Sequence, residues 1–276
     1  MYKAIDVSKT FRIKNIYTAF GKRYDSTYYF EGEHHNFWEI VTVVDGEIGV
    51  TAGSDVFVLK KGQAIIHEPM EFHRLWSEGS TCPKIIIFSF EAENVPEYSS
   101  KIFEVDDVLY PEMVLGMIRR NFGAEEYELT DMVEKQGISY QLAVKKLEMY
   151  ILDTVSQKVE EHSLIKSKAA ENYTAIIKVL ENNIDKNLLV SEIAKMCNMS
   201  EINLKKTFSK YAGMGVMDYF NRLKIAEATK MIKEGASVAE AAASFGFANQ
   251  NYFSTVFKRI TGNPPSSYRK TKDLKI

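Results

Sequence analysis

The chain has 276 residues with 45% hydrophobic content, enough to build packed cores in two domains of ordinary size, and its formal net charge is −2. Cys82 and Cys197 lie far apart and fit neither a disulfide framework nor a zinc site, so we expect a reducing compartment. The first residues lack the apolar core of a signal peptide and no apolar run reaches the length of a membrane span, so we expect a soluble, cytoplasmic protein that engages no membrane.

The first third of the chain is rich in β-branched and aromatic residues with frequent glycines. The stretch IVTVVDGEIGV (40–50) places two apolar runs around Asp45 and Gly46, which predicts a β-hairpin. The stretch DVFVLKKGQAIIHE (55–68) repeats this form around Gly62. The apolar run PKIIIFSFEA follows as another buried strand, and many short strands at close spacing indicate an antiparallel β-sandwich or barrel.

Helical periodicity replaces this pattern over residues 111–162. Apolar residues recur there at steps of three and four and form one stripe, which comprises Val144, Leu147, Ile151, Val155 and Val159. We expect this stripe to pack either on the chain's own β-domain or on a second subunit. Residues 163–172, SLIKSKAAEN, are polar and weakly patterned, which predicts a linker.

The remaining chain reads as short helices and contains a degenerate internal repeat. Residues 188–213 and 236–262 each place a short helix with a central alanine before a turn, followed by a second helix with a phenylalanine and a closing glycine. The matching pairs are Ala194 and Ala242, Asn198 and Gly246, Phe208 and Phe257, and Gly213 and Gly262. Two helices joined by a tight turn form a helix-turn-helix unit, whose second helix enters the DNA major groove.

The last helix of the second repeat begins with three carboxamides, Asn249, Gln250 and Asn251. No carboxylate occurs between Glu240 and Asp273, although acids are usual in a first helical turn. Carboxylates would repel phosphates, whereas amides can bond bidentately to adenine. We therefore interpret Gln250 and Asn251 as base-reading residues, with Ser254 and Thr255 one turn further along the same groove. A helix face that simply meets solvent is the alternative.

The charge is distributed unevenly along the chain. Residues 171–276 carry 16 Lys and Arg against 10 Asp and Glu, whereas residues 1–170 carry 19 against 27. This suggests that only the C-terminal part meets a polyanion, with an ordinary protein surface as the alternative. Beside a recognition helix we interpret Lys258 and Arg269 as phosphate contacts, which position a protein on DNA without specifying a sequence.

A longer pattern covers this region, GF-x-N-x-x-YFS-x-x-FK-x-x-x-G-x-x-P-x-x-YR, and runs from Gly246 to Arg269. It resembles the signature of the AraC/XylS family of bacterial transcription regulators, and the resemblance covers about residues 172–270. It implies two helix-turn-helix units joined by a long helix, here over 216–234, with their recognition helices in successive major grooves. Lys224 stands where the family usually has arginine.

Carried across position by position, the resemblance implies base-facing residues in both recognition helices: Ile202, Asn203, Lys205 and Lys206 in the first, and Gln250, Asn251 and Thr255 in the second. The candidate DNA-contacting set is completed by Asn249, Ser254, Lys258 and Arg269. Double-stranded DNA is the expected partner, and RNA polymerase is a further candidate. A homodimer is favoured, because a monomer covering one short site gains little specificity over the genomic background.

Two stretches of the N-terminal part carry a second resemblance. GEHHNFWEIVTVVDG (32–46) has His35, Glu39 and Gly46 at the spacing of the first cupin motif, and HEPMEFHRLW (67–76) resembles the second motif. In cupins these motifs bind a metal, and imidazole with carboxylate suits Fe, Mn, Ni or Zn. The second motif lacks its usual glycine and asparagine. We therefore predict a metal-free barrel without a cofactor, whose inward positions hold an organic ligand; a metal-binding cupin enzyme with a helical appendage is the alternative.

Aromatic residues surround these positions: Tyr28, Phe30, Phe37, Trp38, Phe72 and Trp76. Aromatic faces with a few placed polar groups suit a small polar molecule such as a sugar, and ordinary barrel core is the alternative. Because side chains alternate along a strand, we assign Glu39 to the interior with His35 and Phe37, and Trp38 to the exterior. The candidate ligand-binding set is His35, Phe37, Glu39, His73 and Arg74.

These patterns together predict an α+β multidomain protein. Residues 1–108 form a cupin-like antiparallel β-barrel sensor domain, residues 109–165 a helical connector and dimerisation region, and residues 170–276 an all-α DNA-binding domain with two helix-turn-helix units. The favoured function is a sequence-specific transcription regulator controlled by a small polar effector, with no catalytic residue. A DNA binder gated only by a protein partner is a further alternative.

Overall fold

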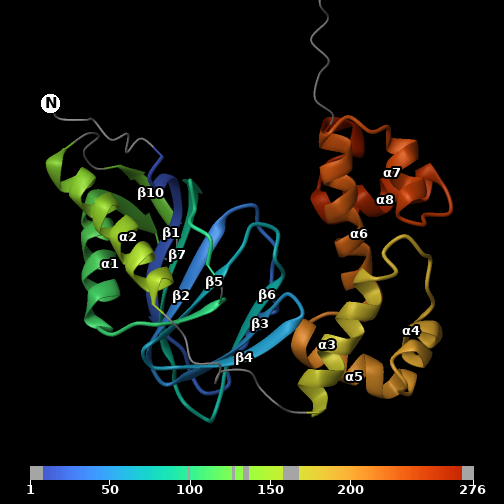
Figure 1. The fold of residues 1–276 in the computed structure, drawn as a ribbon, viewed down its shortest axis with the longest axis horizontal. Coiled ribbons are helices and arrows are strands. Elements are labelled where there is room, and N and C mark those ends of the chain that lie inside the picture. Colours follow the sequence, from blue (N-terminus) through green and yellow to red (C-terminus); the bar gives the residue numbers. More distant parts are fainter. Residues whose placement is uncertain (1–8, 99, 126–127, 133–136, 158–167, 269–276) are drawn as a thin grey trace, which may run out of the picture. The chain divides into compact units, whose positions relative to one another are not determined.

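The computed structural model describes residues 9–98, 100–125, 128–132, 137–157 and 168–268. The chain divides into two compact units, Met1–Ile165 and Lys166–Ile276 (Figure 1). The N-terminal unit is built on β-sheets with two helices, and the C-terminal unit is helical. No helix among the described residues is both long and apolar enough to cross a membrane.

The strands of the N-terminal unit pair antiparallel in two sheets. The larger sheet has the order β8-β5-β2-β7-β1-β10-β9, with β1 Arg12–Arg23, β2 Trp38–Asp45, β5 Gln63–His67, β7 Lys84–Glu93, β8 Ile102–Glu104, β9 Phe122–Glu125 and β10 Glu128–Met132. The smaller sheet has the order β4-β3-β6, with β3 Glu47–Ala52, β4 Asp55–Lys60 and β6 His73–Ser77. The predicted antiparallel β-domain is thus confirmed, with its described strands in two sheets rather than one closed ladder.

The inner faces of both sheets enclose one apolar core. Val41 and Val43 of β2 lie in the same buried cluster as Ile48 and Val50 of β3 and Leu75 of β6. These residues sit at alternate positions of their strands, as the period of two requires. Each fully buried aliphatic side chain contributes about 1.5–3 kcal/mol relative to exposure, so this core holds the two sheets face to face.

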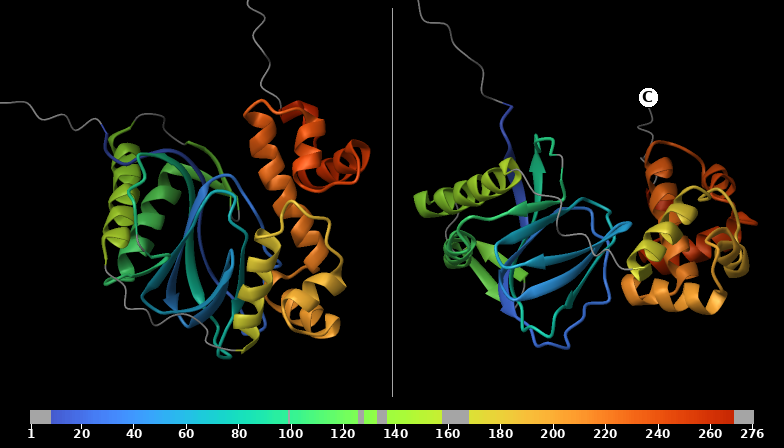
Figure 2. Two further views of the ribbon diagram at one scale, coloured as in Figure 1. Left: turned by 45° about the vertical axis from the view of Figure 1, so that its right-hand side comes forward. Right: turned by 60° about the horizontal axis from the view of Figure 1, so that its bottom comes forward.

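Two helices, α1 Leu109–Asn121 and α2 Ile138–Ser156, cover the outer face of the larger sheet (Figure 2). Leu147 and Ile151 of α2 are buried in one cluster with Ile40 and Phe88, which point outward from β2 and β7. The predicted apolar stripe therefore packs on the chain's own sheet. Its partner is the N-terminal unit itself, and the stripe is not the exposed surface on which a second subunit would dock.

Val144 and Val155 border the same cluster, whereas the stripe's last predicted member, Val159, lies outside the described residues. The other side of α2 exposes a second set of apolar side chains, Ile138, Leu142, Met149 and Leu152. These positions recur at helical spacing, so they share one face.

Both predicted hairpins are wrong in their pairing, although the turns are placed correctly. The chain turns at Gly46 and at Gly62, both with positive φ, but β2 and β5 belong to the larger sheet and β3 and β4 to the smaller one. Each turn is therefore a corner at which the chain passes between sheets. The close hairpin of this region joins β3 to β4 through Gly53 and Ser54.

Two further boundaries differ from the sequence analysis. The predicted helical region is interrupted by the antiparallel pair β9–β10, and β10 also pairs with β1. The predicted linker ends earlier than expected, since α3 begins at Lys168.

The C-terminal unit consists of short helices around one long one: α3 Lys168–Glu181, α4 Val190–Met196, α5 Glu201–Ala212, α6 Val216–Lys233, α7 Val238–Ser244, α8 Gln250–Thr261 and the 3₁₀ helix η1 Pro265–Tyr268. Helices α4–α5 and α7–α8 are the two helix-turn-helix pairs, and α6 contacts both α5 and α8. The predicted all-α arrangement and the long central helix are confirmed.

The turns of the two pairs use left-handed backbone at equivalent places, Asn198 with φ 53° and Gly246 with φ 66°. The predicted closing glycines, Gly213 and Gly262, cap α5 and α8 in the same conformation. Gly246 also lies against the backbone of the loop before α4, since a Cβ there would come 2.4 Å from the carbonyl oxygen of Asp185. The second pair is therefore anchored to the first half of the unit.

Lys224 of α6 lies at the same junction. Its ammonium group donates hydrogen bonds to the carbonyl oxygens of Lys186 and Phe245, the latter over 2.8 Å. The side chain is 4% exposed and lies beside the rings of Phe220 and Phe247. One cation thus joins the loop before the first helix-turn-helix pair to the turn of the second.

Candidate functional site

A cavity of about 380 Å³ lies within the N-terminal unit. Its wall is largely aromatic and includes Phe20, Tyr24, Tyr28, Phe30 and Phe37. Its polar groups are Thr18, Lys22, Glu33, Glu39, His73 and Ser89. This mixture of aromatic faces and a few polar groups is typical of a small-molecule site.

The register predicted for β2 is confirmed. Glu39 is buried and lines the cavity, in step with Val41 and Val43 of the inner core. Trp38 packs instead against the cluster under α1 and α2, with its ring edge-on to Tyr98. Alternation along the strand therefore fixes which of the two neighbours reaches the cavity.

Backbone pairing holds a second carboxylate opposite a histidine. Glu33 and His73 exchange two backbone hydrogen bonds of 3.0 and 3.2 Å in an isolated antiparallel bridge. Gly32 precedes the bridge at φ +98°, where a Cβ would come 2.6 Å from the ring of Phe72. The glycine thus allows the segment to approach β6 closely enough for the bridge to form.

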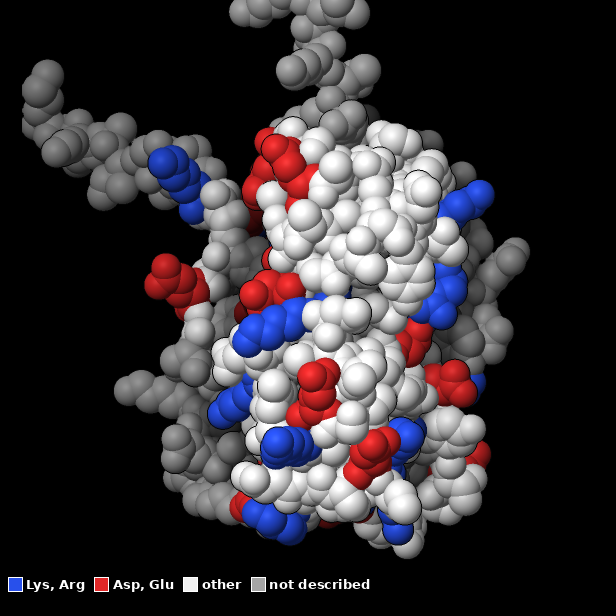
Figure 3. Space-filling view, turned by 90° about the vertical axis from the view of Figure 1, so that its right-hand side faces the viewer, with Lys and Arg blue, Asp and Glu red and all other residues white. Residues whose placement is uncertain are grey.

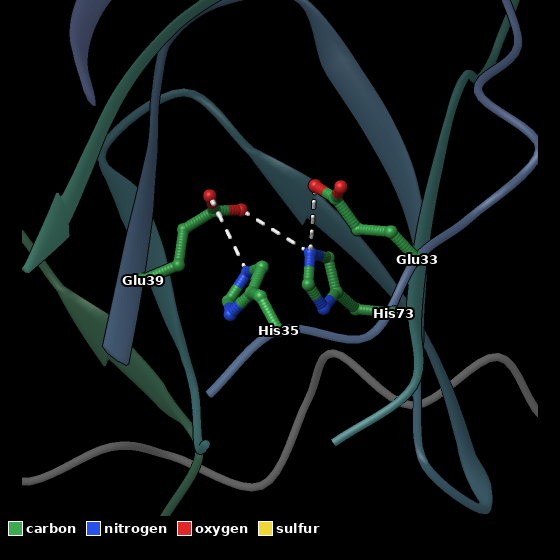
Figure 4. A group of neighbouring side chains, drawn as sticks. All are labelled: Glu33, His35, Glu39 and His73. Carbon is green, nitrogen blue, oxygen red and sulfur yellow. Dashed lines mark ion pairs between the residues drawn. The ribbon is translucent and has the colours of Figure 1, made fainter. Parts of the chain in front are cut away.

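Four side chains, Glu33, His35, Glu39 and His73, converge at the polar end of the cavity (Figure 4). Nε2 of His73 lies 3.4 Å from Oε1 of Glu39 and 3.7 Å from Oε1 of Glu33, and Nε2 of His35 lies 3.8 Å from Oε2 of Glu39. The hydroxyl of Ser89 donates a 2.8 Å hydrogen bond to Oε2 of Glu39. The carboxylate of Glu39 therefore stands at the centre of the group.

The environment shifts the pKa values of these groups in opposite directions. Burial lowers the pKa of His35 below its usual value, and lowers that of the fully buried His67 further. Burial also lowers the pKa of His73, but the carboxylates of Glu33 and Glu39 outweigh it and raise that pKa to about 9. The close contact with His73 in turn lowers the pKa of Glu33.

Arg74 does not belong to this group, so its assignment to the ligand site is corrected. It follows the inward His73 on β6 and takes the opposite face, where its Nε donates a 2.9 Å hydrogen bond to the carbonyl oxygen of Phe30. His35 and Phe37 lie as predicted beside Glu39, with their rings stacked at 3.9 Å. Glu33 was not predicted to belong to this group, although it stands two residues before His35 and so on the same side of an extended chain.

Two further buried groups lie behind His73. The ring of His67 stacks on that of His73 at 4.3 Å, and its Nδ1 lies 3.3 Å from Oε2 of Glu71. Lys101 forms an ion pair with the same carboxylate. These groups hold the His73 ring from its far side. The sequence pattern does not predict these contacts.

The first recognition helix, α5, presents the predicted residues outward. Ile202, Asn203, Lys205 and Lys206 are exposed, and Ile202 is 81% exposed despite its apolar side chain. Glu201 pairs with Lys205 on the same face at 3.6 Å, as expected for a first-turn acid in an i,i+4 pair. The capping hydroxyl of Ser200 accepts from the backbone N–H of Asn203.

The second recognition helix, α8, begins without an acidic residue in its first turn. Gln250, Asn251 and Thr255 are exposed, and Ser254 is half-buried. Asn249 takes a structural position instead, because its side-chain oxygen accepts a 2.8 Å hydrogen bond from the N–H of Tyr252 and caps the helix. The amides at the start of α8 thus divide into one cap and two outward-facing groups.

The predicted phosphate contacts lie further along. Lys258 is exposed, and Ser254, Thr255, Lys258, Arg259 and Pro264 line a shallow surface hollow. Arg259 reaches Asp218 of α6 at 3.5 Å, so part of its charge is engaged within the unit. Arg269 lies outside the described residues.

Figure 3 shows one side of the C-terminal unit. Lysine and arginine side chains alternate there with aspartate and glutamate over the lower part, and the upper part is largely uncharged. The basic side chains that the structure describes are therefore not gathered into one patch on this side.

The fold and the two sites define a two-domain protein with a β-sheet ligand cavity and a pair of helix-turn-helix units. Residues 16–151 match the family described as an AraC-like ligand binding domain, and residues 193–271 match a family described as a helix-turn-helix domain. The chain belongs to the AraC family of transcription regulators.

Individual relatives agree with this membership. The Bacillus subtilis (strain 168) protein named bifunctional transcriptional activator/DNA repair enzyme AdaA is 27% identical over 100 residues, which are 36% of this chain and 47% of that protein. The HTH-type transcriptional regulator YfiF of the same organism is 22% identical over 254 residues, 88% of this chain and 80% of YfiF. The first of these relatives is thus spanned over less than half of its length.

Among solved structures, ToxT from Vibrio cholerae O395 aligns with 95% of this chain and 97% of its own at 15% identity, with a TM-score of 0.37.

Proposed function

We propose that this protein is a bacterial, sequence-specific DNA-binding transcription regulator that responds to a small polar effector, and that it is not an enzyme. The observation that carries the proposal is the pair of exposed recognition helices, α5 and α8, each at the second position of a helix-turn-helix pair. Such helices place the residues of their first turns against base edges. The site of action is then the cytoplasm, where bacterial DNA lies.

The start of α8 supports base readout in particular. Gln250 and Asn251 are exposed in its first turn, and a carboxamide can donate to and accept from adenine at once. Lys258 lies about two turns further along α8 and is suited to a phosphate oxygen, which adds affinity without sequence preference. Substitution of Gln250 should therefore change the sequence preference, whereas substitution of Lys258 should change the overall affinity for DNA.

For Gln250→Ala we expect a relaxed base preference at one position of the site, with a loss of about 1–3 kcal/mol for the preferred base. Selection of binding sites from a random DNA pool with the purified chain measures the profile at every position. Lys258→Ala is the comparison: it should weaken all sequences alike and reduce the slope of log K against log salt by about 1. An unchanged profile for Gln250→Ala would remove this residue from the reading set.

The effector site in this proposal is the cavity of the N-terminal unit. Its aromatic wall can cover the apolar face of a sugar ring, and the carboxylates of Glu33 and Glu39 can accept hydrogen bonds from hydroxyls. A carbohydrate is therefore the effector class that we propose. The effector can shift DNA binding only by its differential affinity for the two functional states.

Tyr28→Ala tests the cavity. Tyr28 lines the wall and stacks on Tyr24 with ring centroids 3.7 Å apart, so its loss should weaken binding of a carbohydrate effector roughly tenfold, or about 1.4 kcal/mol. Calorimetric titration of the full chain against a panel of monosaccharides measures the affinity. Tyr29→Ala is the matched control, because the neighbouring ring is 62% exposed and does not line the cavity. Equal losses in both variants would place the effector elsewhere.

We also propose a homodimer, which doubles the length of DNA that is read. The exposed apolar face of α2 supports it: Ile138, Leu142, Met149 and Leu152 stand on the side opposite the buried stripe. RNA polymerase is a further proposed partner, since a regulator bound beside a promoter can touch it.

A further inference from the structure

Contrary to the metal-free barrel predicted from the sequence, we infer that Glu33, His35, Glu39 and His73 bind one divalent transition-metal ion at the polar end of the cavity. Each side chain offers one ligand atom, and these atoms all lie within 4.8 Å of one another (Figure 4). This inference rests on the proposed function, in which the cavity is the effector site, and adds a metal ion to that site.

Each histidine is oriented by a backbone carbonyl. Nδ1 of His35 lies 2.9 Å from the carbonyl oxygen of Phe37, and Nδ1 of His73 lies 3.2 Å from that of Glu71. A carbonyl oxygen can only accept, so Nδ1 carries the hydrogen in each ring, and the Nε2 of a neutral ring presents a lone pair. Metal-binding histidines commonly donate their second ring N–H in this way.

Both Nε2 atoms face carboxylate oxygens of Glu33 or Glu39. The three contacts of 3.4, 3.7 and 3.8 Å lack hydrogen-bond geometry, and Nε2 of His35 and of His73 are buried without a hydrogen-bond partner among the described residues. The carboxylates of Glu33 and Glu39 also carry like charges, and their ligand atoms lie within 4.8 Å of each other, which is unfavourable. A divalent cation between the four groups takes the place of any hydrogen on Nε2, and its double positive charge balances the two carboxylates.

The spacing fits an ion of this class. Ligands about 2.1 Å from a zinc ion at tetrahedral angles lie roughly 3.4 Å apart, close to the observed separations. Two imidazoles and two carboxylates favour first-row transition ions over calcium and magnesium, which prefer all-oxygen surroundings.

The four groups also differ in access. The side chain of His73 is 1% exposed, and Glu39 is held by the hydroxyl of Ser89, so these ligands are fixed in place. The side chain of Glu33 is 49% exposed and lies where solvent reaches the group. An ion can therefore arrive on the side of Glu33 and find the buried ligands already oriented.

The test uses the full chain, freed of metal by a chelator and titrated with Zn²⁺ in a calorimeter, with Co²⁺ absorption as a second readout of the ligand geometry. We expect one equivalent per chain and a higher unfolding temperature with Zn²⁺. Glu33→Gln, at the exposed ligand, should weaken binding at least tenfold with the fold intact by circular dichroism. His35→Ala with His73→Ala should abolish saturable binding.

His34→Ala is the matched control, since His34 is adjacent in sequence and its ring packs on Phe72 outside the group. It should keep one equivalent of Zn²⁺. Absence of saturable binding of Zn²⁺, Co²⁺ and Mn²⁺ by the wild-type chain would overturn the inference, as would equal losses in His34→Ala and Glu33→Gln. Binding of DNA by the metal-free chain is measured separately. The experiment therefore distinguishes failure of the metal site from failure of the proposed function.

Discussion

Replacing Lys224 with alanine should lower the free energy of unfolding of the C-terminal unit by about 3–5 kcal/mol relative to the wild-type chain. The ammonium group holds two carbonyl oxygens, those of Lys186 and Phe245, and both lie at the junction of the two helix-turn-helix pairs. Removing the donor leaves two acceptors unsatisfied, at about 1–3 kcal/mol each. The lost packing of the side-chain stem beside Phe220 and Phe247 adds to this.

Because Lys224 bonds to both halves of the C-terminal unit, this loss of stability should affect the whole unit. Burial lowers the pKa of Lys224 to about 8, so the ammonium form still predominates at neutral pH. An arginine at this position would keep its charge but spread its donors over a planar fork. The lysine instead reaches two separate carbonyls from one point, and alanine can reach neither.

The measurement exploits the distribution of tryptophan. Trp38 and Trp76, the two tryptophans of the chain, both lie in the N-terminal unit, so their fluorescence reports that unit. Far-UV circular dichroism is dominated by helices, and most of the described helices lie in the C-terminal unit. Lys224→Ala should shift the dichroism transition in urea and leave the fluorescence transition in place. Lys230→Ala is the control, because its ammonium pairs with Glu227 at the surface and should change stability by less than about 0.5 kcal/mol. Coincident transitions for Lys224→Ala and the wild type would refute the structural role.

The C-terminal unit was predictable because its signals are local. A left-handed turn residue, a capping glycine and a buried alanine each act within one helix pair, so Asn198, Gly246, Gly213 and Gly262 could be placed from the sequence. The close approach of Gly246 to Asp185 could not, since it joins segments about sixty residues apart. The same holds for the bonds of Lys224, whose sequence neighbours say nothing about Lys186.

The β-domain shows where a local pattern is insufficient. Apolar runs around Gly46 and Gly62 predict turns, and turns are found, but strand pairing depends on which distant strand completes each sheet. At Gly46 a Cβ would come 2.9 Å from Pro83, so the glycine serves a tight corner rather than a two-stranded ribbon. Tertiary context therefore decided the pairing.

The cavity was predicted in part for the same reason. The period of two placed Glu39 inward and Trp38 outward, and both are found so. Applied to His73 and Arg74, the same rule would have excluded the arginine, because adjacent strand residues take opposite faces. The same rule would have placed Glu33 on the side of His35, two residues further on, whereas its bridge to His73 is a long-range pairing that the sequence does not show.

The second large effect is expected for Leu147→Asp, which should unfold the N-terminal unit. Leu147 is completely buried between α2 and the larger sheet, in the cluster that contains Phe88 and Tyr150. Truncating such a leucine costs about 2–5 kcal/mol, and burying an unpaired carboxylate costs several more. The sum reaches the whole stability of an ordinary domain, about 5–15 kcal/mol, so tryptophan fluorescence should report an unfolded unit without denaturant.

Met149→Asp separates this packing from assembly. Met149 is 49% exposed, on the face of α2 that also carries Leu142 and Leu152, so the aspartate stays in water and stability should change by less than about 1 kcal/mol. If that face joins two subunits, two carboxylates would meet across the interface, and sedimentation at micromolar concentration should show a folded monomer with weakened affinity for DNA. A wild-type chain that sediments as a monomer, or a Met149→Asp chain that remains a dimer, would show that this apolar face is not the dimer interface. Leu147→Asp cannot decide this point, because it destroys the domain on which the interface would be built.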